Sequence, residues 1–357
     1  MTIATRNQLP SLDGIRACAV TLVILAHAGL GGKVPGGFGV TVFFFLSGVL
    51  ITTLMLEEHT KTGSINLRLL YARRLLRLTP PLAIILFISW IATLLGFLHG
   101  HLSGAALLSQ LCFFHNYYLL SDGLNFVNGL EILWSLAVEE QFYLLFPPIF
   151  VFARLPFVRL KWIFSALLMI LAWRLVRVHV FGSTEWQMYL STDTRLDSIL
   201  YGCLLGLMPM SQRRAMFPDG KLALVVLSAA VFALLATFVV RDAEFRSTFR
   251  YTVQGFALIP IFHYAVSKPE MMLFRPLNMK ILRQVGIYSY SIYLIHFVII
   301  QNMPKFGLGG NEAIGFTFAS SGLISLGFGA SIYRFLEKPL QPFRRKLQPV
   351  APKLHIR

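Results

Sequence analysis

Apolar stretches of about 20 residues, the length that a helix needs to cross a bilayer, recur along almost the whole chain. They are found near 12–31, 38–56, 78–98, 131–152, 162–181, 192–210, 221–240, 251–267, 284–303 and 313–335. This pattern predicts an all-α integral membrane protein, a bundle of about ten transmembrane helices. The shorter apolar segment 105–120 is rich in aromatic residues, and we interpret it as an interfacial or re-entrant piece.

The composition excludes an ordinary soluble domain. Hydrophobic residues make up 56% of the chain and charged residues 13%, against roughly 25% charged residues in an average soluble domain. The net charge of +16 could suggest a nucleic-acid partner. However, the basic residues lie in short loops between apolar runs and not on one amphipathic surface, so we expect no nucleic acid. The three cysteines are widely spaced, and no metal site is predicted.

The basic residues predict the topology. If the N-terminus is cytoplasmic, the stretch 99–131, which has no Lys or Arg, lies outside. The positive-inside rule then places both termini of a multi-pass membrane protein in the cytoplasm. We expect a transmembrane domain over 1–336 and a short basic cytoplasmic tail over 337–357, with no soluble domain attached. The basic residues of the predicted cytoplasmic loops are Lys61, Arg68, Arg73, Arg74, Arg77, Arg154, Arg159, Lys161, Arg213, Arg214, Lys221, Lys268, Arg275, Lys280 and Arg283.

Two ionisable residues share one face of the first predicted helix. Arg16 and His27 are eleven residues apart, which is close to three helical turns and roughly 16 Å along the axis. Asp13 precedes Arg16 by three residues at the cytoplasmic end. A snorkelling arginine and a structural histidine would explain the pair. A buried imidazole is also the usual base near neutral pH, so His27 is a candidate catalytic residue.

Other helices carry further candidates. Arg74 and Arg77 share a face of the third predicted helix and could bind phosphate, or could serve only as topological charges near lipid headgroups. Ser135 and Glu139 share a face of the fourth, where a carboxylate facing the interior could assist His27. Two other groups suit either a polyol acceptor or helix packing: Arg195 and Asp197 in the sixth helix, and Ser289, Tyr293 and His296 in the ninth.

These motifs occur in the order seen in a known family. The chain resembles the acyltransferase family 3 membrane proteins, which O-acylate carbohydrates and related acceptors outside the cytoplasm. The resemblance covers nearly the whole chain and lies in LDGIRACAVTLVILAHA, GVTVFFFLSGVLIT, RRLLRLTP, LWSLAVEEQFYLLFP, SYSIYLIH and YRFLEKP. At Thr41 many relatives carry Asp, and some relatives have a fused SGNH-type hydrolase-like domain that we do not expect here.

The resemblance implies a multi-pass membrane-bound O-acyltransferase of the bacterial cytoplasmic (inner) membrane, with His27 essential for transfer and Glu139 in the active centre. It implies that Arg16, Arg74 and Arg77 hold cytoplasmic acyl-CoA, with acetyl the common acyl group, for transfer to a carbohydrate or glycoconjugate of the cell envelope. The alternative is a proton-coupled secondary transporter or exporter of a polar solute, although no inverted repeat is visible. The identity of the acceptor and the oligomeric state do not follow from the sequence.

Overall fold

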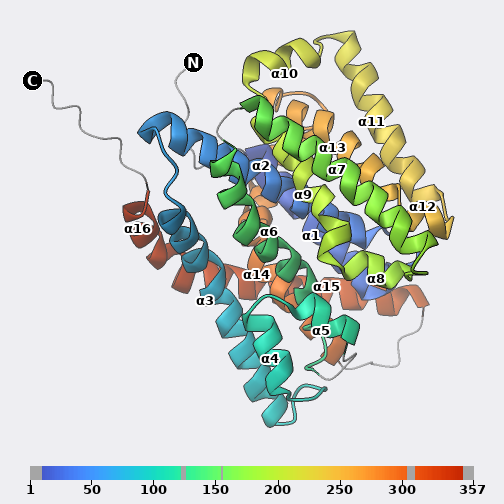
Figure 1. The fold of residues 1–357 in the computed structure, drawn as a ribbon. Helices are drawn as coiled ribbons and strands as arrows, with labels where there is room; N and C mark the ends of the chain where they lie inside the picture. The colour runs from blue at the N-terminus through green and yellow to red at the C-terminus, as the bar shows by residue number, and fades with distance from the viewer. Residues whose placement is uncertain (1–9, 122–125, 154–155, 304–309, 349–357) are drawn as a thin grey trace, which may run out of the picture.

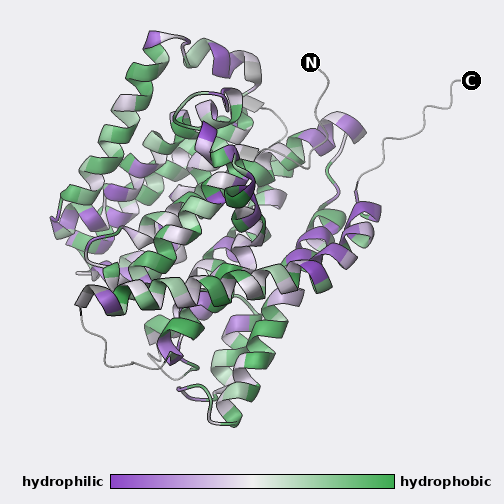
Figure 2. Cartoon of the chain, turned by 180° about the vertical axis from the view of Figure 1, so that it is seen from behind, coloured by the Kyte–Doolittle hydropathy of each residue, from purple (hydrophilic) through white to green (hydrophobic). Residues whose placement is uncertain are grey.

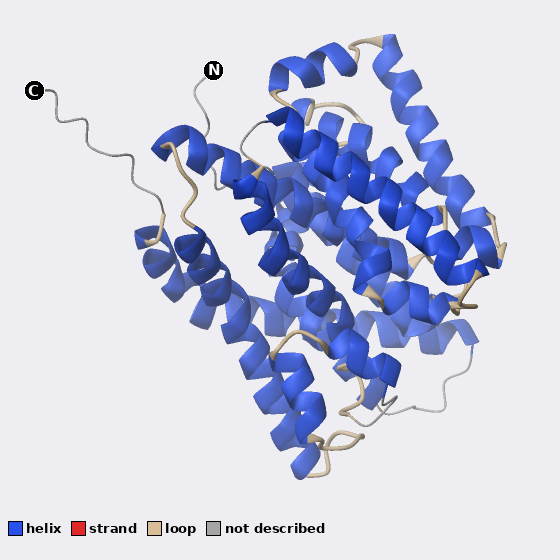
Figure 3. Ribbon diagram, in the orientation of Figure 1, coloured by secondary structure: helices blue, strands red, loops and turns tan. Residues whose placement is uncertain are grey.

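The chain is helical throughout the described residues, which in the computed structural model are 10–121, 126–153, 156–303 and 310–348 (Figure 1). Within these ranges loops join the helices and no β-strand forms (Figure 3). The long helices are α1 (Pro10–Leu25), α2 (Gly36–Thr62), α3 (Leu67–Leu94), α6 (Leu133–Phe152), α7 (Pro156–His179), α9 (Thr192–Leu207), α11 (Lys221–Val239), α13 (Arg250–Ser267), α14 (Lys280–Asn302) and α15 (Gly310–Ile332). The short ones are α4 (Gly104–Leu111), α5 (His115–Ser121), α8 (Glu185–Leu190), α10 (Met210–Met216), α12 (Ala243–Ser247) and α16 (Lys338–Lys346).

Each predicted apolar segment coincides with one of the long helices. Among the described residues, six helical stretches are long and apolar enough to cross a membrane. They are Ser11–Leu30, Gly36–Thr62, Leu67–Leu94, Val158–His179, Lys221–Val239 and Glu312–Lys346. The all-helical membrane fold is therefore confirmed, whereas the count of about ten spans and the cytoplasmic position of both termini stay predictions.

The outer faces of the bundle carry large apolar side chains. Phe87, Leu94, Phe152, Phe232 and Val239 are 63% to 80% exposed. In water such a surface would promote aggregation, and it matches the hydrocarbon of a bilayer. The polarity of the surface changes along α3, which is hydrophilic beside α16 and hydrophobic toward its other end (Figure 2).

Helices α1 and α14 run in parallel. Ser11 donates a hydrogen bond to Asn278 just before α14 begins, and His27 meets His296 near the other end of the same pair. These helices are the first and ninth predicted segments, which have the same direction if successive segments cross in alternate directions.

Helices α2 and α9 also run in parallel. Arg195 bonds Thr41 near the start of both helices, and Gly206 lies against Thr52 farther along. They are the second and sixth predicted segments, so their direction is also the one that alternation requires.

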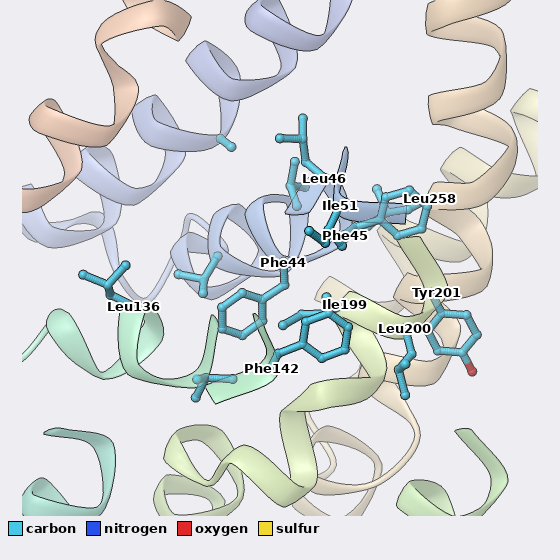
Figure 4. Close-up of a cluster of buried hydrophobic side chains, with 14 of the residues drawn as sticks. Phe44, Phe45, Leu46, Ile51, Leu136, Phe142, Ile199, Leu200, Tyr201 and Leu258 are labelled. Carbon is cyan, nitrogen blue, oxygen red and sulfur yellow. The ribbon is translucent and has the colours of Figure 1, made fainter. Parts of the chain in front are cut away.

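The centre of the bundle is the contact between α2 and α9. A Cβ added to Gly48 would lie 1.9 Å from the carbonyl oxygen of Ile199, and one added to Gly202 would lie 1.9 Å from that of Phe45. Glycine is therefore required on both helices for the backbones to come this close. Side chains of α6 and α13 complete the core around the contact (Figure 4).

Helix α3 begins at Leu67, before the predicted apolar stretch 78–98, and includes Arg74 and Arg77 as the sequence analysis expected. The Asn66 side chain caps its N-terminus by accepting a hydrogen bond from the backbone of Leu69.

Two of the arginines that the sequence analysis assigned to a cytoplasmic loop have acidic partners: Arg73 pairs with Glu58 at 2.7 Å, and Arg74 pairs with Glu139 and Glu140. Arg68 and Arg77 are exposed. Arginine and leucine both favour helix, so the helix continues through this basic segment.

The apolar segment 105–120 forms α4 and α5, which turn at Phe113, a residue with φ of +57°. Asn116 donates hydrogen bonds to the Leu190 carbonyl and to Thr192, so the segment packs on α8 and α9. Whether it is interfacial or re-entrant stays a prediction.

The predicted tail begins at the last residue of a π-helical turn, Tyr333–Glu337, and its described part continues as α16. Arg73 of α3 donates to the carbonyl of Leu347, 2.9 Å away, which ties the tail to the bundle. Residues 349–357 lie outside the described residues.

Candidate functional site

His27 lies where α1 widens into a π-helical turn, Ala26–Leu30. Such turns are rare and often occur at functional sites. The turn closes at Gly29, whose φ of +115° disfavours residues with a Cβ. The His27 ring stacks on Phe297, with ring centroids 4.1 Å apart, and its Nδ1 lies 2.9 Å from Nε2 of His296.

The hydrogen-bond pattern determines which nitrogen of His27 carries the proton when both imidazoles are neutral. Nδ1 of His296 lies 2.6 Å from the Tyr293 carbonyl oxygen, which can only accept, so Nδ1 of His296 donates. Nε2 of His296 therefore accepts, and Nδ1 of His27 donates to it. This leaves Nε2 of His27 with a free lone pair, and no hydrogen bond to it is found within the described ranges.

Polar side chains of α14 continue away from the histidines. Tyr293 lies edge-on to Phe43 and shares a 2.7 Å hydrogen bond with Ser135 of α6. One turn earlier Tyr290 donates to the Leu78 carbonyl of α3. We call Tyr290, Tyr293 and His296 the α14 column. The predicted candidate Ser289 is buried one residue before it.

A second polar centre surrounds Arg74. Its guanidinium pairs with both Glu139 and Glu140 of α6, with N–O distances of 2.9 Å and 2.5 Å, and covers the Tyr143 ring at 3.0 Å. Ser47 of α2 donates to the same carboxylate of Glu139. The Arg74 side chain is therefore already neutralised by two acids.

The suggestion that Glu139 could assist His27 is not matched by a direct hydrogen bond between them among the described residues. Within the described residues, the hydrogen-bond partners of Glu139 are Ser47 and Arg74, and the imidazole pairs with His296 instead. Opposite charge explains the outcome, because a carboxylate beside a guanidinium is better compensated in a bilayer than one beside a neutral imidazole.

Arg16 and Arg77 lie near the Arg74 centre. Arg16 pairs with Asp13 at 2.7 Å, as the spacing predicts, and is close enough to interact electrostatically with Arg77 and Tyr143. The structure thus brings the three predicted donor-binding arginines to one region.

A hollow of about 310 Å³ opens at the start of α14, lined by Asn278, Lys280, Arg283, Gln284 and Ile287. This hollow lies at the opposite end of α14 from His296.

Arg195 and Asp197 lie in another part of the bundle, and both are fully buried. Asp197 pairs with Arg174 of α7 at 2.5 Å, which fits the structural alternative. Arg195 donates to Thr41 and lies over the Tyr251 ring at 3.7 Å.

Sequence reasoning missed three contributors to these centres: Ser47, Tyr143 and Phe297. Tyr143 follows Glu139 by four residues, so helical spacing could have indicated it. Ser47 and Phe297 carry no such signal, because their partners come from other helices.

The comparison with protein families identifies the chain. A model described as an acyltransferase domain matches residues 9–334. The chain belongs to acyltransferase family 3.

Among curated relatives, this family member is 30% identical over 348 residues to the O-acetyltransferase OatA of Staphylococcus aureus strain NCTC 8325. It is 29% identical over 356 residues to a putative O-acetyltransferase of S. aureus strain COL. Each alignment covers 93% of this chain and 57% of the relative, so the chain spans little more than half the length of these relatives. No solved structure matches the chain.

Proposed function

We propose that this acyltransferase moves an acyl group, acetyl by likeness to its relatives, from cytoplasmic acyl-CoA to a hydroxyl of a cell-envelope carbohydrate or glycoconjugate. The observation that carries the proposal is the free Nε2 lone pair of His27, oriented by His296. The α14 column supports it by linking this imidazole to the arginine-rich end of the bundle. A route across the bilayer for a neutral acyl group avoids moving charge through hydrocarbon.

The arrangement allows two forms of the reaction. In the first, Nε2 of His27 takes the proton of the acceptor hydroxyl while its oxygen attacks the thioester carbonyl, and the departing CoA thiolate then takes that proton. In the second, Nε2 attacks the thioester carbonyl and CoA thiolate leaves; the acceptor hydroxyl then attacks the acyl-imidazole, the ester leaves the imidazole, and the hydroxyl proton passes through the imidazole to the CoA thiolate. Incubation with radiolabelled acetyl-CoA without acceptor separates them, since only the second form labels the protein.

The same experiment tests the proposed function against transport. An acyltransferase releases one free CoA for each acyl group that reaches the acceptor, whereas an exporter releases none. Label on the acceptor with matching CoA release is the expected result. Solute movement without CoA release would reject the proposal.

We further propose ten spans with both termini in the cytoplasm of the inner membrane. The parallel pairs α1/α14 and α2/α9 support an alternating arrangement. Single cysteines at Lys33 and Lys61 test it, in a variant whose native cysteines are replaced. A membrane-impermeant thiol reagent should label intact cells at position 33 and not at 61, and the reverse pattern would contradict the topology.

In the proposed donor site, Arg77 is the arginine that a phosphate can most easily engage, because it is exposed whereas Arg16 and Arg74 are paired with carboxylates. Among the described residues, Glu337 interacts with Arg77 only from beyond ion-pair distance. Replacing Arg77 with Gln should raise KM for acetyl-CoA about 10- to 100-fold, the value of one or two charge-assisted hydrogen bonds, with little change in kcat. Steady-state kinetics in membranes measures this. The matched control is Arg68→Gln, and an unchanged KM for Arg77→Gln would assign Arg77 to topology alone.

His296 should act as a positioning residue. In His296→Leu, Nδ1 of His27 loses its acceptor, and kcat should fall about 10- to 100-fold, while His296→Gln places a carbonyl oxygen near the position of Nε2 and should restore most of the rate. Rates per inserted protein measure the effect. Equal losses in both variants would indicate that His296 serves packing only.

A further inference from the structure

A group of fully buried charges near the start of α9 contains more cations than anions. Arg174, Arg195 and Asp197 are all 0% exposed. Asp197 pairs with Arg174, and among the described residues no carboxylate lies within ion-pair distance of Arg195. Asp197 attracts Arg195 only from beyond ion-pair distance. This group of two cations and one anion therefore has one excess positive charge in the interior of a membrane protein, where such a charge is costly.

The hydrogen bonds of Arg195 are also incomplete. Nη2 donates to Thr41 at 3.0 Å, whereas Nε and Nη1 are buried without a partner in the described part of the chain. Native proteins leave few buried donors unpaired, so a group with two such nitrogens needs an explanation.

Aromatic rings surround this guanidinium. Tyr251 lies 3.7 Å from it, and Tyr189 and Phe44 lie 5.5 and 5.6 Å away. Tyr189, in the short helix α8, also packs on Trp134 with ring centroids 4.5 Å apart. Aromatic faces beside a cation suit a ligand that has an apolar ring face and an anionic group, as an acidic sugar does.

We propose that Arg195 binds the carboxylate of the acceptor, so that the acceptor belongs to the acidic sugars. The inference rests on the function proposed above. A monoanion matches the single uncompensated charge and supplies the acceptor oxygens that Nε and Nη1 lack. Tyr189 is close enough to interact electrostatically with both Arg195 and Tyr293, which connects this site to the α14 column. The Arg195 side chain is fully enclosed in this structure, so the proposal requires the surrounding side chains to open before a ligand can bind.

The test measures binding without any acyl donor. Purified protein in detergent is titrated with glucuronate, glucose and chloride in a carboxylate-free buffer, using thermal shift and calorimetry. Glucuronate should bind and raise Tm, whereas glucose and chloride should not. Arg195→Gln should weaken glucuronate binding about 10- to 100-fold. Equal effects of chloride and glucuronate, or no effect of either, would overturn the proposal.

A second variant keeps the test informative if Arg195→Gln does not fold. Thr41→Asp places a carboxylate where Arg195 already donates, so it should raise Tm of the free protein and abolish glucuronate binding. The neutral control Thr41→Asn should retain binding. If Thr41→Asp bound glucuronate as the unaltered protein does, the proposal would fail. His27→Ala separates this proposal from the proposed function, because that variant should lose transfer and still bind glucuronate.

Discussion

Replacing His27 with alanine is expected to reduce acyl transfer about 10³-fold or more while the protein still inserts and folds. The variant loses the nitrogen that acts in either form of the proposed reaction, and general base catalysis alone accounts for about 10²- to 10⁴-fold. The measurement is radiolabelled acetyl transfer in membranes, normalised to the folded protein recovered by size-exclusion chromatography.

The control for His27 is another buried imidazole. His263 of α13 stacks on Phe217 with ring centroids 4.5 Å apart and lies outside the α14 column. His263→Ala should keep transfer within a few-fold of the unaltered protein once the amount of folded protein is matched. A His27→Ala variant that retained a tenth of the activity or more would remove His27 from the mechanism.

The second large effect concerns the fold. Gly202→Ala is expected to destabilise the bundle by more than about 3 kcal/mol, because the new methyl group would meet the Phe45 backbone and the helices α2 and α9 would have to separate. Loss of the monodisperse peak, or a Tm lowered by many degrees in detergent, measures this. Gly327→Ala is the matched control, since a Cβ there meets nothing within 4 Å. Equal stability of the two variants would show that α2 and α9 are not in such close contact.

The comparison of these two variants also tests the candidate sites. Both the Arg74 centre, through Ser47, and the Arg195 site, through Thr41, depend on α2. If α2 and α9 separate, the two sites should lose their geometry together, whereas Gly327→Ala should leave acetyl-CoA kinetics and glucuronate binding unchanged.

Much of the fold was predictable because hydrophobicity is a local property. Each run of about 20 apolar residues became a helix, since in a bilayer the backbone must satisfy its hydrogen bonds internally. The ion pair of Asp13 with Arg16 was predictable for the same reason, since helical spacing fixes it within one turn. The start of α3 was not apparent from hydrophobicity, because its first turns are basic. The structure pairs Arg73 with an acid of α2 and Arg74 with acids of α6.

The candidate site, like the fold, has features that the sequence predicts and features that only the structure reveals. The sequence by itself determined a membrane bundle of family 3, with an imidazole on the first helix and basic residues toward one end. Only the tertiary structure decided the partners: His296 for His27, two glutamates for Arg74, and a threonine for Arg195. These partners depend on which helices lie side by side. A buried charge pairs with the opposite charge or polar group that helix packing brings within about 3 Å of it.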